Sequence, residues 1–297
     1  MKDKRYYQFS NENFIDTHNF HPEFCFYLVG LIEGDGTIIV PKTERSLKGK
    51  INYPSIQIAF DSRDLALVLL IQNLLGFGSV SKTKGKNAYR LTINNYSGLI
   101  TLVRLLNGKF KTVKLYDFNL LIKFLNDKFP DLNFKIHDLN RSPLDSNAWL
   151  SGFIDADGHF FVRLNKERVS CGFELVQAIL DKKNNNKKEI MENLAQFLKV
   201  KVNIVSKGYC QANNQYKVKT TSLISNLILS EYLHKYPLFS SKFLNFQDFY
   251  KVLLLIQNQK HKTENEKDLI LSIKNKMNNN RTEFIWNHLH NFYYINK

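Results

Sequence analysis

Two aspartates occupy the same unusual position in two copies of one nine-residue segment. The segment LVGLIEGDG at residues 28–36 returns as LSGFIDADG at residues 150–158, and each copy is an apolar helical stretch that stops at an acid followed by glycine, at Asp35 and at Asp157. The C-terminal end of a helix carries about half a negative charge, so an acid there costs about 0.3–1 kcal/mol. Because a divalent cation would reverse that penalty, the repeated acids predict a metal site. The alternative is a pair of solvated acids beside glycines that only cap the helices in the left-handed conformation.

The same two segments carry small residues four positions apart. These are Gly30 with Gly34 in the first copy and Gly152 with Ala156 in the second. Residues four apart share one helix face, and without side-chain bulk two helix axes can approach more closely than the usual ~8–10 Å. We therefore expect the two helices to pack on each other at a lobe interface, with the two acids side by side.

These paired segments resemble the motif of the LAGLIDADG homing endonucleases, in the single-chain form with two motifs, over residues 22–278. The resemblance implies a site-specific endonuclease that makes a staggered cut in a long double-stranded DNA target and promotes intron mobility. It implies Mg²⁺ held by Asp35 and Asp157, with Mn²⁺ able to substitute and Ca²⁺ supporting binding without cleavage. Glu33 and Asp155, two residues earlier in each copy, are rival ligands on helical geometry alone. The choice between the two pairs rests on the resemblance.

A second repeated pattern, K-x-x-x-F, begins at Lys114 and at Lys242. Family members place a basic residue near the scissile phosphate at this point, which implies that these lysines stabilise transition-state charge or polarise the attacking water. An exposed lysine at the start of a helix is the alternative. Gln177 is similar to the family's glutamine that orders water at the active site, but its counterpart in the first half is Phe60. We therefore expect two unequal active sites.

The composition of the 297-residue chain indicates a polyanionic partner. The chain has 42 Lys+Arg against 27 Asp+Glu and a formal net charge of +15, and nucleic acid is the usual partner of so basic a protein. Its richness in lysine and asparagine is also what an AT-rich gene would encode. An organellar gene fits that skew, with the mitochondrion expected first and the chloroplast as the alternative.

The cysteines and the apolar runs indicate where the protein acts. Three cysteines, Cys25, Cys171 and Cys210, are far apart and lack metal-site spacing, which predicts a reduced intracellular protein without a zinc site. The longest apolar runs are shorter than the ~20 residues that a membrane helix needs. We therefore expect no membrane partner. We also expect a monomer, because one chain carries both motif copies.

The repeat divides the chain into two lobes. We expect an N-terminal lobe at residues 20–130, a linker at 131–146, a C-terminal lobe at 147–264, and a terminal helix and tail at 265–297. Alternating and periodic apolar patterns predict an α+β fold of two pseudo-symmetric αββαββα lobes, each a four-stranded antiparallel sheet with helices on one face. The expected strands lie at 37–40, 53–60, 78–84, 89–94, 159–164, 170–180, 200–207 and 215–221.

The open sheet faces and their turns are expected to form a DNA-binding saddle. Lysines mostly hold phosphates, and asparagine and glutamine read base edges, so binding should weaken with salt. A solvated polar face is the alternative for any single residue. The candidates are Lys42, Arg45, Lys48, Lys50, Asn52, Gln57, Lys82, Lys84, Lys86, Arg90, Arg163, Lys166, Arg168, Lys201, Asn203, Lys207, Lys217 and Lys219, interleaved with Tyr53, Tyr89, Gln211, Asn213 and Gln215.

The competing function is an RNA-binding intron maturase on the same scaffold, since some family members assist the splicing of their own intron RNA. An RNA chaperone does not need the two acids and the two lysines, so their retention favours DNA cleavage. The histidines add little. His159 begins a predicted strand, and His288 with His290 is expected in a surface tail rather than in a metal site.

Overall fold

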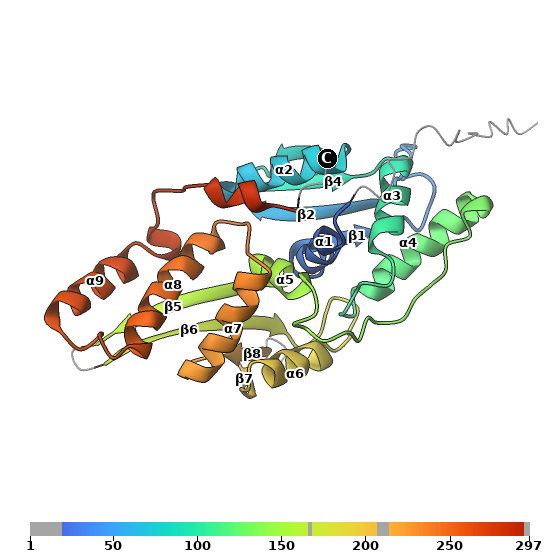
Figure 1. Ribbon diagram of the computed structural model, residues 1–297. Helices are drawn as coiled ribbons and strands as arrows, with labels where there is room; N and C mark the ends of the chain where they lie inside the picture. Colours follow the sequence, from blue (N-terminus) through green and yellow to red (C-terminus); the bar gives the residue numbers. More distant parts are fainter. Residues whose placement is uncertain (1–19, 166–167, 207–213, 294–297) are drawn as a thin grey trace, which may run out of the picture.

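The computed structural model describes residues 20–165, 168–206 and 214–293, which form two lobes of the same architecture (Figure 1). The N-terminal lobe contains α1 (Pro22–Asp35), β1 (Gly36–Ile39), β2 (Ser55–Asp61), the 3-10 turn η3 (Ser62–Asp64), α2 (Leu65–Leu75), β3 (Ser79–Lys82), β4 (Ala88–Ile93), α3 (Tyr96–Leu106) and α4 (Leu115–Lys128). The C-terminal lobe contains α5 (Trp149–Asp157), β5 (Gly158–Leu164), β6 (Val169–Ala178), α6 (Lys188–Phe197), β7 (Val202–Val205), β8 (Gln215–Lys219), α7 (Leu223–Lys235) and α8 (Lys242–Gln257). Each lobe ends in two helices, one more than the predicted αββαββα pattern.

Each lobe contains one four-stranded antiparallel sheet, which confirms the predicted α+β fold. The strand orders are β1-β2-β4-β3 and β5-β6-β8-β7. In β2 the alternate residues Ile56, Ile58 and Phe60 are buried, whereas Gln57 and Ala59 between them are more exposed, because successive side chains point to opposite faces of a sheet. Helices α1, α2 and α4 pack against the first sheet, and α6 and α8 against the second.

The glycine after each motif aspartate begins a strand. Gly36 has φ −85° and ψ 157°, and Gly158 has φ −74° and ψ 153°, so the predicted left-handed caps are wrong. Any residue adopts these angles, but a Cβ at Gly36 would lie 2.5 Å from the carbonyl oxygen of Ile32. Glycine is required because the strand leaves the helix end at close range.

Helices α1 and α5 touch through their small residues, in the middle of the molecule (Figure 1). A Cβ at Gly152 would lie 2.0 Å from the carbonyl oxygen of Tyr27, and one at Gly30 would lie 2.1 Å from a carbonyl oxygen of α5. Nearer the C-terminal ends, a Cβ at Gly34 would lie 2.2 Å from the Cβ of Ala156. Backbone therefore packs directly on backbone, and dispersion contacts hold the two lobes together.

The N-terminal ends of both motif helices are capped by side chains of the first lobe. Nδ1 of His21 accepts the backbone N–H of Glu23 at 3.1 Å, and Pro22 occupies the first helical position, which suits proline. The carboxylate of Glu23 in turn accepts the backbone N–H of Ala148 at 2.6 Å, at the start of α5. One acid thus stabilises two helix N-termini in different lobes.

The linker between the lobes is tied to the first lobe by a lysine. It contains a short 3-10 turn, η4 (Pro130–Leu132). The ammonium of Lys111 donates to Asn140 Oδ1 at 3.0 Å and to Ser142 Oγ at 2.8 Å. Burial lowers the pKa of Lys111 to about 8. The linker is therefore anchored just before α4.

The chain after the second lobe returns to the first (Figure 1). Helix α9 (Glu264–Asn275) packs beside β5 and α8, and the segment after it contains the short turns η6 (Asn278–Asn280) and η7 (Asn287–Asn291). At its end Phe292 is 2% exposed and packs against Phe24, Tyr27 and Phe239. The tail therefore covers the junction of α1 with the second lobe.

His288 lies in this tail and is buried, which corrects its expected place on the surface. Its ring stacks on Phe243 with the ring centroids 4.1 Å apart. Packing of the tail against α8 is the physical reason, since the aromatic residues around His288 shield it from water.

No helix in the described part of the chain is both long and apolar enough to cross a membrane.

Gly152→Ala is expected to destabilise the protein, although alanine in place of glycine stabilises an ordinary helix by about 1 kcal/mol. The new Cβ meets the carbonyl oxygen of Tyr27, so α1 and α5 must separate at a cost of about 1–3 kcal/mol. Urea unfolding measures the difference. Asn193→Ala, on the exposed face of α6, is the control and should stay within about 0.5 kcal/mol of wild type. A Gly152→Ala protein as stable as wild type would contradict the close packing.

Candidate active sites at the lobe interface

Asp35 and Asp157 end the two motif helices next to each other. Oδ2 of Asp157 lies 3.1 Å from the position that a Cβ would take at Gly34, one residue before Asp35. Part of Asp35 is open to water, but desolvation by the surrounding protein and the negative charge of Asp157 raise its pKa from 3.8 to about 7. Two acids at adjacent helix C-terminal ends repel each other and favour a bound cation.

Lys114 and Lys242 reach the carbonyl ends of the motif helices. Nζ of Lys114 donates to the carbonyl oxygens of Ile32 at 2.8 Å and of Gly36 at 2.6 Å. Nζ of Lys242 donates to the carbonyl oxygen of Ala156 at 2.5 Å. Burial lowers the pKa of both ammonium groups, that of Lys114 to about 8. Each lysine thus brings the positive charge that a helix C-terminus favours.

The rival acid Glu33 is 3% exposed and faces protein donors. Its carboxylate accepts the backbone N–H groups of Lys111 at 3.0 Å and of Thr112 at 2.6 Å, and the indole N–H of Trp149 at 2.5 Å. Burial raises the pKa of Glu33, and these hydrogen bonds oppose the rise. Glu33 therefore fixes the segment that carries Lys114.

Asp155 is the corresponding residue of the second lobe and is 6% exposed. It accepts the backbone N–H of Phe239 at 2.7 Å, the hydroxyl of Ser240 at 2.5 Å and the phenol of Tyr27 at 2.7 Å. Burial raises its pKa, and these donors oppose the rise. Since both rival acids are occupied by protein donors, the last acid of each motif is the one left to meet a ligand.

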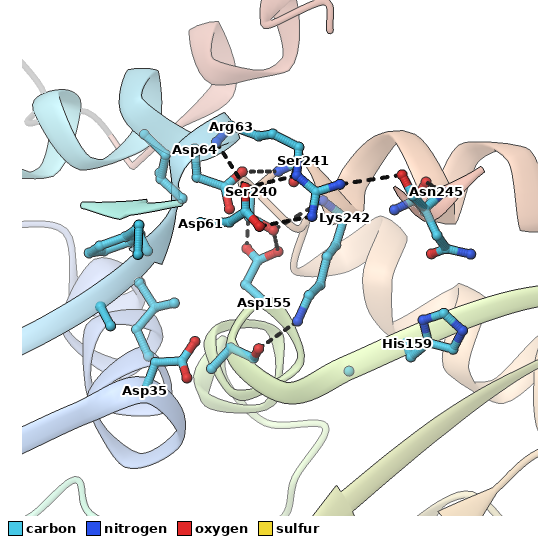
Figure 2. Close-up of a pocket in the computed structure, with 18 of the residues that line it drawn as sticks. Asp35, Asp61, Arg63, Asp64, Asp155, His159, Ser240, Ser241, Lys242 and Asn245 are labelled. Atoms are coloured by element: carbon cyan, nitrogen blue, oxygen red, sulfur yellow. Dashed lines mark hydrogen bonds and ion pairs between the residues drawn. The ribbon is translucent and has the colours of Figure 1, made fainter. Parts of the chain in front are cut away.

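A cavity of about 480 Å³ lies beside Asp35 and is lined by both lobes. Figure 2 shows Asp35 from α1 on one side of it, Asp61 and Asp64 above, and Lys242 extending from α8 toward the end of α5. Lys242 of the other lobe lowers the pKa of Asp35 more than Lys114 of its own lobe does. The first site therefore combines an acid of the N-terminal lobe with a lysine of the C-terminal lobe.

Three charged residues in the wall of this cavity were not predicted from the sequence. Oδ1 of Asp64 accepts the backbone N–H of Ser241 at 2.7 Å and so joins the lobes, and burial raises the pKa of Asp64 to about 6. Asp61 forms an ion pair with Arg63 at 2.8 Å, and Arg63 also donates to the carbonyl oxygen of Asn278 in the tail at 3.3 Å. Their sequence, DSRD, shows only that a helix begins there.

The second site is built around Asp157. Nε2 of Gln177 donates to Oδ2 of Asp157 at 2.6 Å, and Nζ of Lys187 donates to Oε1 of Gln177 at 2.7 Å. Lys187 and then Asp157 appear among the charges that shift the pKa of Lys114. The second site therefore brings Gln177 and Lys187 of the C-terminal lobe behind Asp157.

The strand register gives Phe60 in β2 the same position that Gln177 has in β6, as the sequence predicts. Phe60 pairs with Tyr89 in the first sheet, and Gln177 pairs with Tyr216 in the second. Lys187, ten residues beyond Gln177, was missed because no repeated pattern includes it. Its hydrogen bond to Gln177 places it in the second site.

The donor set fits a small divalent cation. Within the described residues the carboxylate of Asp35 receives no hydrogen bond, and Asp157 receives one, on Oδ2. No group of three or more His, Cys, Asp and Glu residues in the described ranges could hold a metal by itself. Mg²⁺ is commonly bound through one or two carboxylates together with waters and phosphate oxygens, so the site would be completed by its substrate.

Most of the predicted DNA contacts that the structure describes lie at the surface of the sheets and turns. On the strands, Gln57, Arg90, Lys217 and Lys219 alternate with buried residues and lie on the faces turned away from the helices. The other exposed candidates are Arg163 on β5 and Asn203 on β7, and, in turns or just before a strand, Lys42, Arg45, Lys48, Lys50, Lys84, Lys86, Arg168 and Lys201. Lys166, Lys207, Gln211 and Asn213 lie outside the described residues, as does Cys210.

Two candidates, Lys82 and Tyr89, lie on the sheet face that carries Phe60, where Lys82 is exposed at the end of its strand. Lys82 pairs with Tyr89, and Tyr89 packs against the core on the helix-covered side. The physical reason is the two-residue period of a strand, which turns both side chains to the same face as Phe60.

Some of the basic side chains are already held by the protein. Lys217 forms an ion pair with Glu174 at 2.7 Å. Arg163 and Lys219 both lie over the ring of Phe161, at 4.8 Å from its centroid. In the loop between β1 and β2, Arg45 donates to a backbone carbonyl at 2.7 Å. These contacts limit the freedom of the side chains before any ligand binds.

The sequence profile of LAGLIDADG endonucleases matches the chain twice, at residues 28–125 and 150–253. The chain belongs to the LAGLIDADG endonuclease family. It is 34% identical to the intron-encoded DNA endonuclease aI3 of Saccharomyces cerevisiae, over 91% of this chain and 73% of that protein. It is 33% identical to the intron-encoded RNA maturase bI4 of the same organism, over 46% of this chain and 19% of that protein.

The fold is shared with solved family structures. The LAGLIDADG homing endonuclease I-LtrWI, crystallised with its target DNA, matches with a TM-score of 0.65 and 21% identity, over 88% of this chain and all of that chain. The family assignment therefore agrees with the paired sheets and the central helix contact.

The variants Glu33→Gln and Asp35→Asn should distinguish the acid that stabilises the fold from the acid that binds the metal ion. Glu33→Gln turns an amide toward buried N–H donors and should lower the free energy of unfolding by about 1–3 kcal/mol. Asp35→Asn at pH 8 removes a repulsive charge and should not lower it. Denaturant unfolding of both variants tests this. A stable Glu33→Gln protein that binds no divalent cation would make Glu33 the ligand instead.

Cation binding should stabilise the protein more at pH 8 than at pH 6. Because the pKa of Asp35 is about 7 in the folded state against 3.8 in the unfolded one, the folded protein binds more protons between these values and loses stability as pH rises through them. Above pH 7 the repulsion is complete, and Mg²⁺ that binds the folded state removes it. Melting temperatures with and without Mg²⁺ measure the effect.

Asp35→Asn should abolish this pH dependence, whereas Asp268→Asn, on exposed α9, should keep it. An Mg²⁺ effect of the same size at pH 6 and at pH 8 in the wild type would argue against Asp35 as a ligand.

Proposed function

We propose that this chain is a monomeric, intron-encoded homing endonuclease that cuts both strands of a long DNA target with a stagger, using Mg²⁺. One observation carries the proposal. The two motif acids end adjacent helices at one lobe interface, where Lys242 lines a cavity with Asp35 and Gln177 donates to Asp157. Two strands require two sites, and a single chain with two motif helices supplies both.

The residues of each site suit hydrolysis of a phosphodiester. Bound Mg²⁺ would activate a water and neutralise charge on the phosphate. Lys114, with its pKa of about 8, is mostly protonated at neutral pH and would stabilise negative charge that develops on the phosphate. Lys242 would do the same at the other site. Gln177 holds one oxygen of Asp157 and leaves the other for a ligand.

The surface and the relatives support the DNA target. A net charge of +15 and exposed basic residues beside both sheets favour a phosphate backbone. The relative aI3 is named an intron-encoded DNA endonuclease, and the lysine- and asparagine-rich sequence is typical of an AT-rich organellar gene. We place the protein in an organelle, with the mitochondrion first.

Cleavage of a plasmid that carries the fused exon junction tests the proposal. With Mg²⁺ or Mn²⁺ the wild type should produce linear DNA, and with Ca²⁺ it should bind without cutting. Asp35→Asn and Asp157→Asn should each retain DNA binding and lose the linear product, because each site cuts one strand. Asp268→Asn is the control and should cut as wild type does.

The same assay addresses the maturase alternative, which the partial match to bI4 favours. Absence of linear product with Mg²⁺, together with tight binding to the intron RNA, would replace the endonuclease by an RNA-binding maturase. Continued double-strand cutting by either aspartate variant would refute the assigned metal ligands.

A further inference from the structure

A chain of two hydrogen bonds runs from Lys187 through Gln177 to Asp157. The ammonium of Lys187 donates to Oε1 of Gln177 at 2.7 Å, and Nε2 of Gln177 donates to Oδ2 of Asp157 at 2.6 Å. Gln177 is 6% exposed, so its amide has little access to water as a substitute partner. The second site therefore has an ordered support behind its acid.

The charge of Lys187 decides which way the amide points. An ammonium group can only donate, so the oxygen of Gln177 must face Lys187 and its nitrogen must face Asp157. Without Lys187 the amide could turn its oxygen toward the carboxylate, and two acceptors would then meet. The lysine thus ensures that Asp157 receives a donor on Oδ2 while Oδ1 stays available.

The backbone around Lys187 is fixed by a compact loop. The carboxylate of Asp181 accepts the N–H groups of Lys183 at 2.7 Å and of Asn185 at 2.9 Å. The backbone N–H of Lys187 donates to the carbonyl oxygen of Ile179 at 3.0 Å. Lys187 then stands immediately before α6 and is partly buried. The ammonium is presented by a closed loop rather than by a free surface side chain.

The matching positions of the first lobe carry side chains of different polarity and charge. Phe60 occupies the register of Gln177, and Asp64 stands immediately before α2 as Lys187 stands before α6. Asp64 accepts the backbone N–H of Ser241 at 2.7 Å. The first site therefore has a phenyl ring in place of the amide and an acid in place of the lysine.

We propose that Lys187 is a positioning residue of the second site, which acts through Gln177 on Asp157 and makes cleavage of one DNA strand depend on a support that the other strand's site lacks. This inference rests on the proposed endonuclease function and names the residue that makes its two sites unequal.

Strand-resolved single-turnover cleavage of a duplex labelled on each strand tests the proposal. In Lys187→Met one strand should be cut about 10- to 100-fold more slowly, the usual effect of losing a partner behind a metal ligand. It should be the strand that Gln177→Leu slows, and the other strand should keep its wild-type rate, so nicked DNA accumulates. Lys187→Arg keeps a donor and should restore much of the rate.

Lys188→Met is the matched control, because Lys188 makes an exposed ion pair with Glu192 at 3.3 Å. It should cut both strands as the wild type does. Equal slowing of both strands in Lys187→Met would overturn the proposal. So would a further loss when Lys187→Met is added to Gln177→Leu, since a residue that acts through Gln177 has no effect once that side chain is gone.

A spectroscopic measurement keeps the proposal separate from the endonuclease function. The side-chain amide signal of Gln177 in a ¹⁵N NMR spectrum is assigned by its loss in Gln177→Leu. It should move in Lys187→Met and stay in place in Lys188→Met, and an unmoved signal in Lys187→Met would overturn the positioning role. If the wild type cuts no target, the proposed function fails, whereas this signal still decides the role of Lys187.

Discussion

The contact between α1 and α5 is the constraint on which the rest of the structure depends. Gly30, Gly34 and Gly152 remove the side chains that normally separate two helices, so the helices meet backbone to backbone. The same contact forces two helix C-terminal ends together, each with a partial negative charge and each followed by an aspartate. Close packing of the lobes and electrostatic repulsion at their junction are thus consequences of one arrangement.

Buried polar groups balance part of that repulsion. Lys114 and Lys242 donate to carbonyl oxygens at or just beyond the helix ends, and the inner acids Glu33 and Asp155 hold the segments from which these lysines extend. Each lysine donates to the end of the motif helix of its own lobe, and Lys242 also lines the cavity that contains Asp35 of the other lobe. Asp35, which is exposed, and Asp157, which is half-buried, are left with unbalanced charge, and this is the property that a cation-binding site needs.

Local patterns in the sequence predicted most of the fold, because strand alternation and helical periodicity are local properties. Such patterns predict the two motif helices and the eight strands. They also predict that Phe60 and Gln177 occupy equivalent positions in the two sheets. Burial is not local, and helical spacing alone could not distinguish Glu33 from Asp35. Three-dimensional contacts also decided that Gly36 serves close approach rather than a left-handed turn, and that His288 is buried by a tail folded back across the lobes.

The two lobes keep their pseudo-symmetry at the ends of the motif helices, where both sites need the same chemistry. They lose it in the residues that lie behind the motif aspartates. In both lobes the inner acid accepts backbone N–H groups from the segment just before the lysine, and the lysine donates to carbonyl oxygens at the end of the motif helix. Asp64 and Lys187 lie outside these contacts, so their identities are free to differ. Asp64 serves the union of the lobes through Ser241, and Lys187 serves Gln177. A single chain, unlike a symmetric dimer, can therefore give its two sites different supports without disturbing the helices that hold them together.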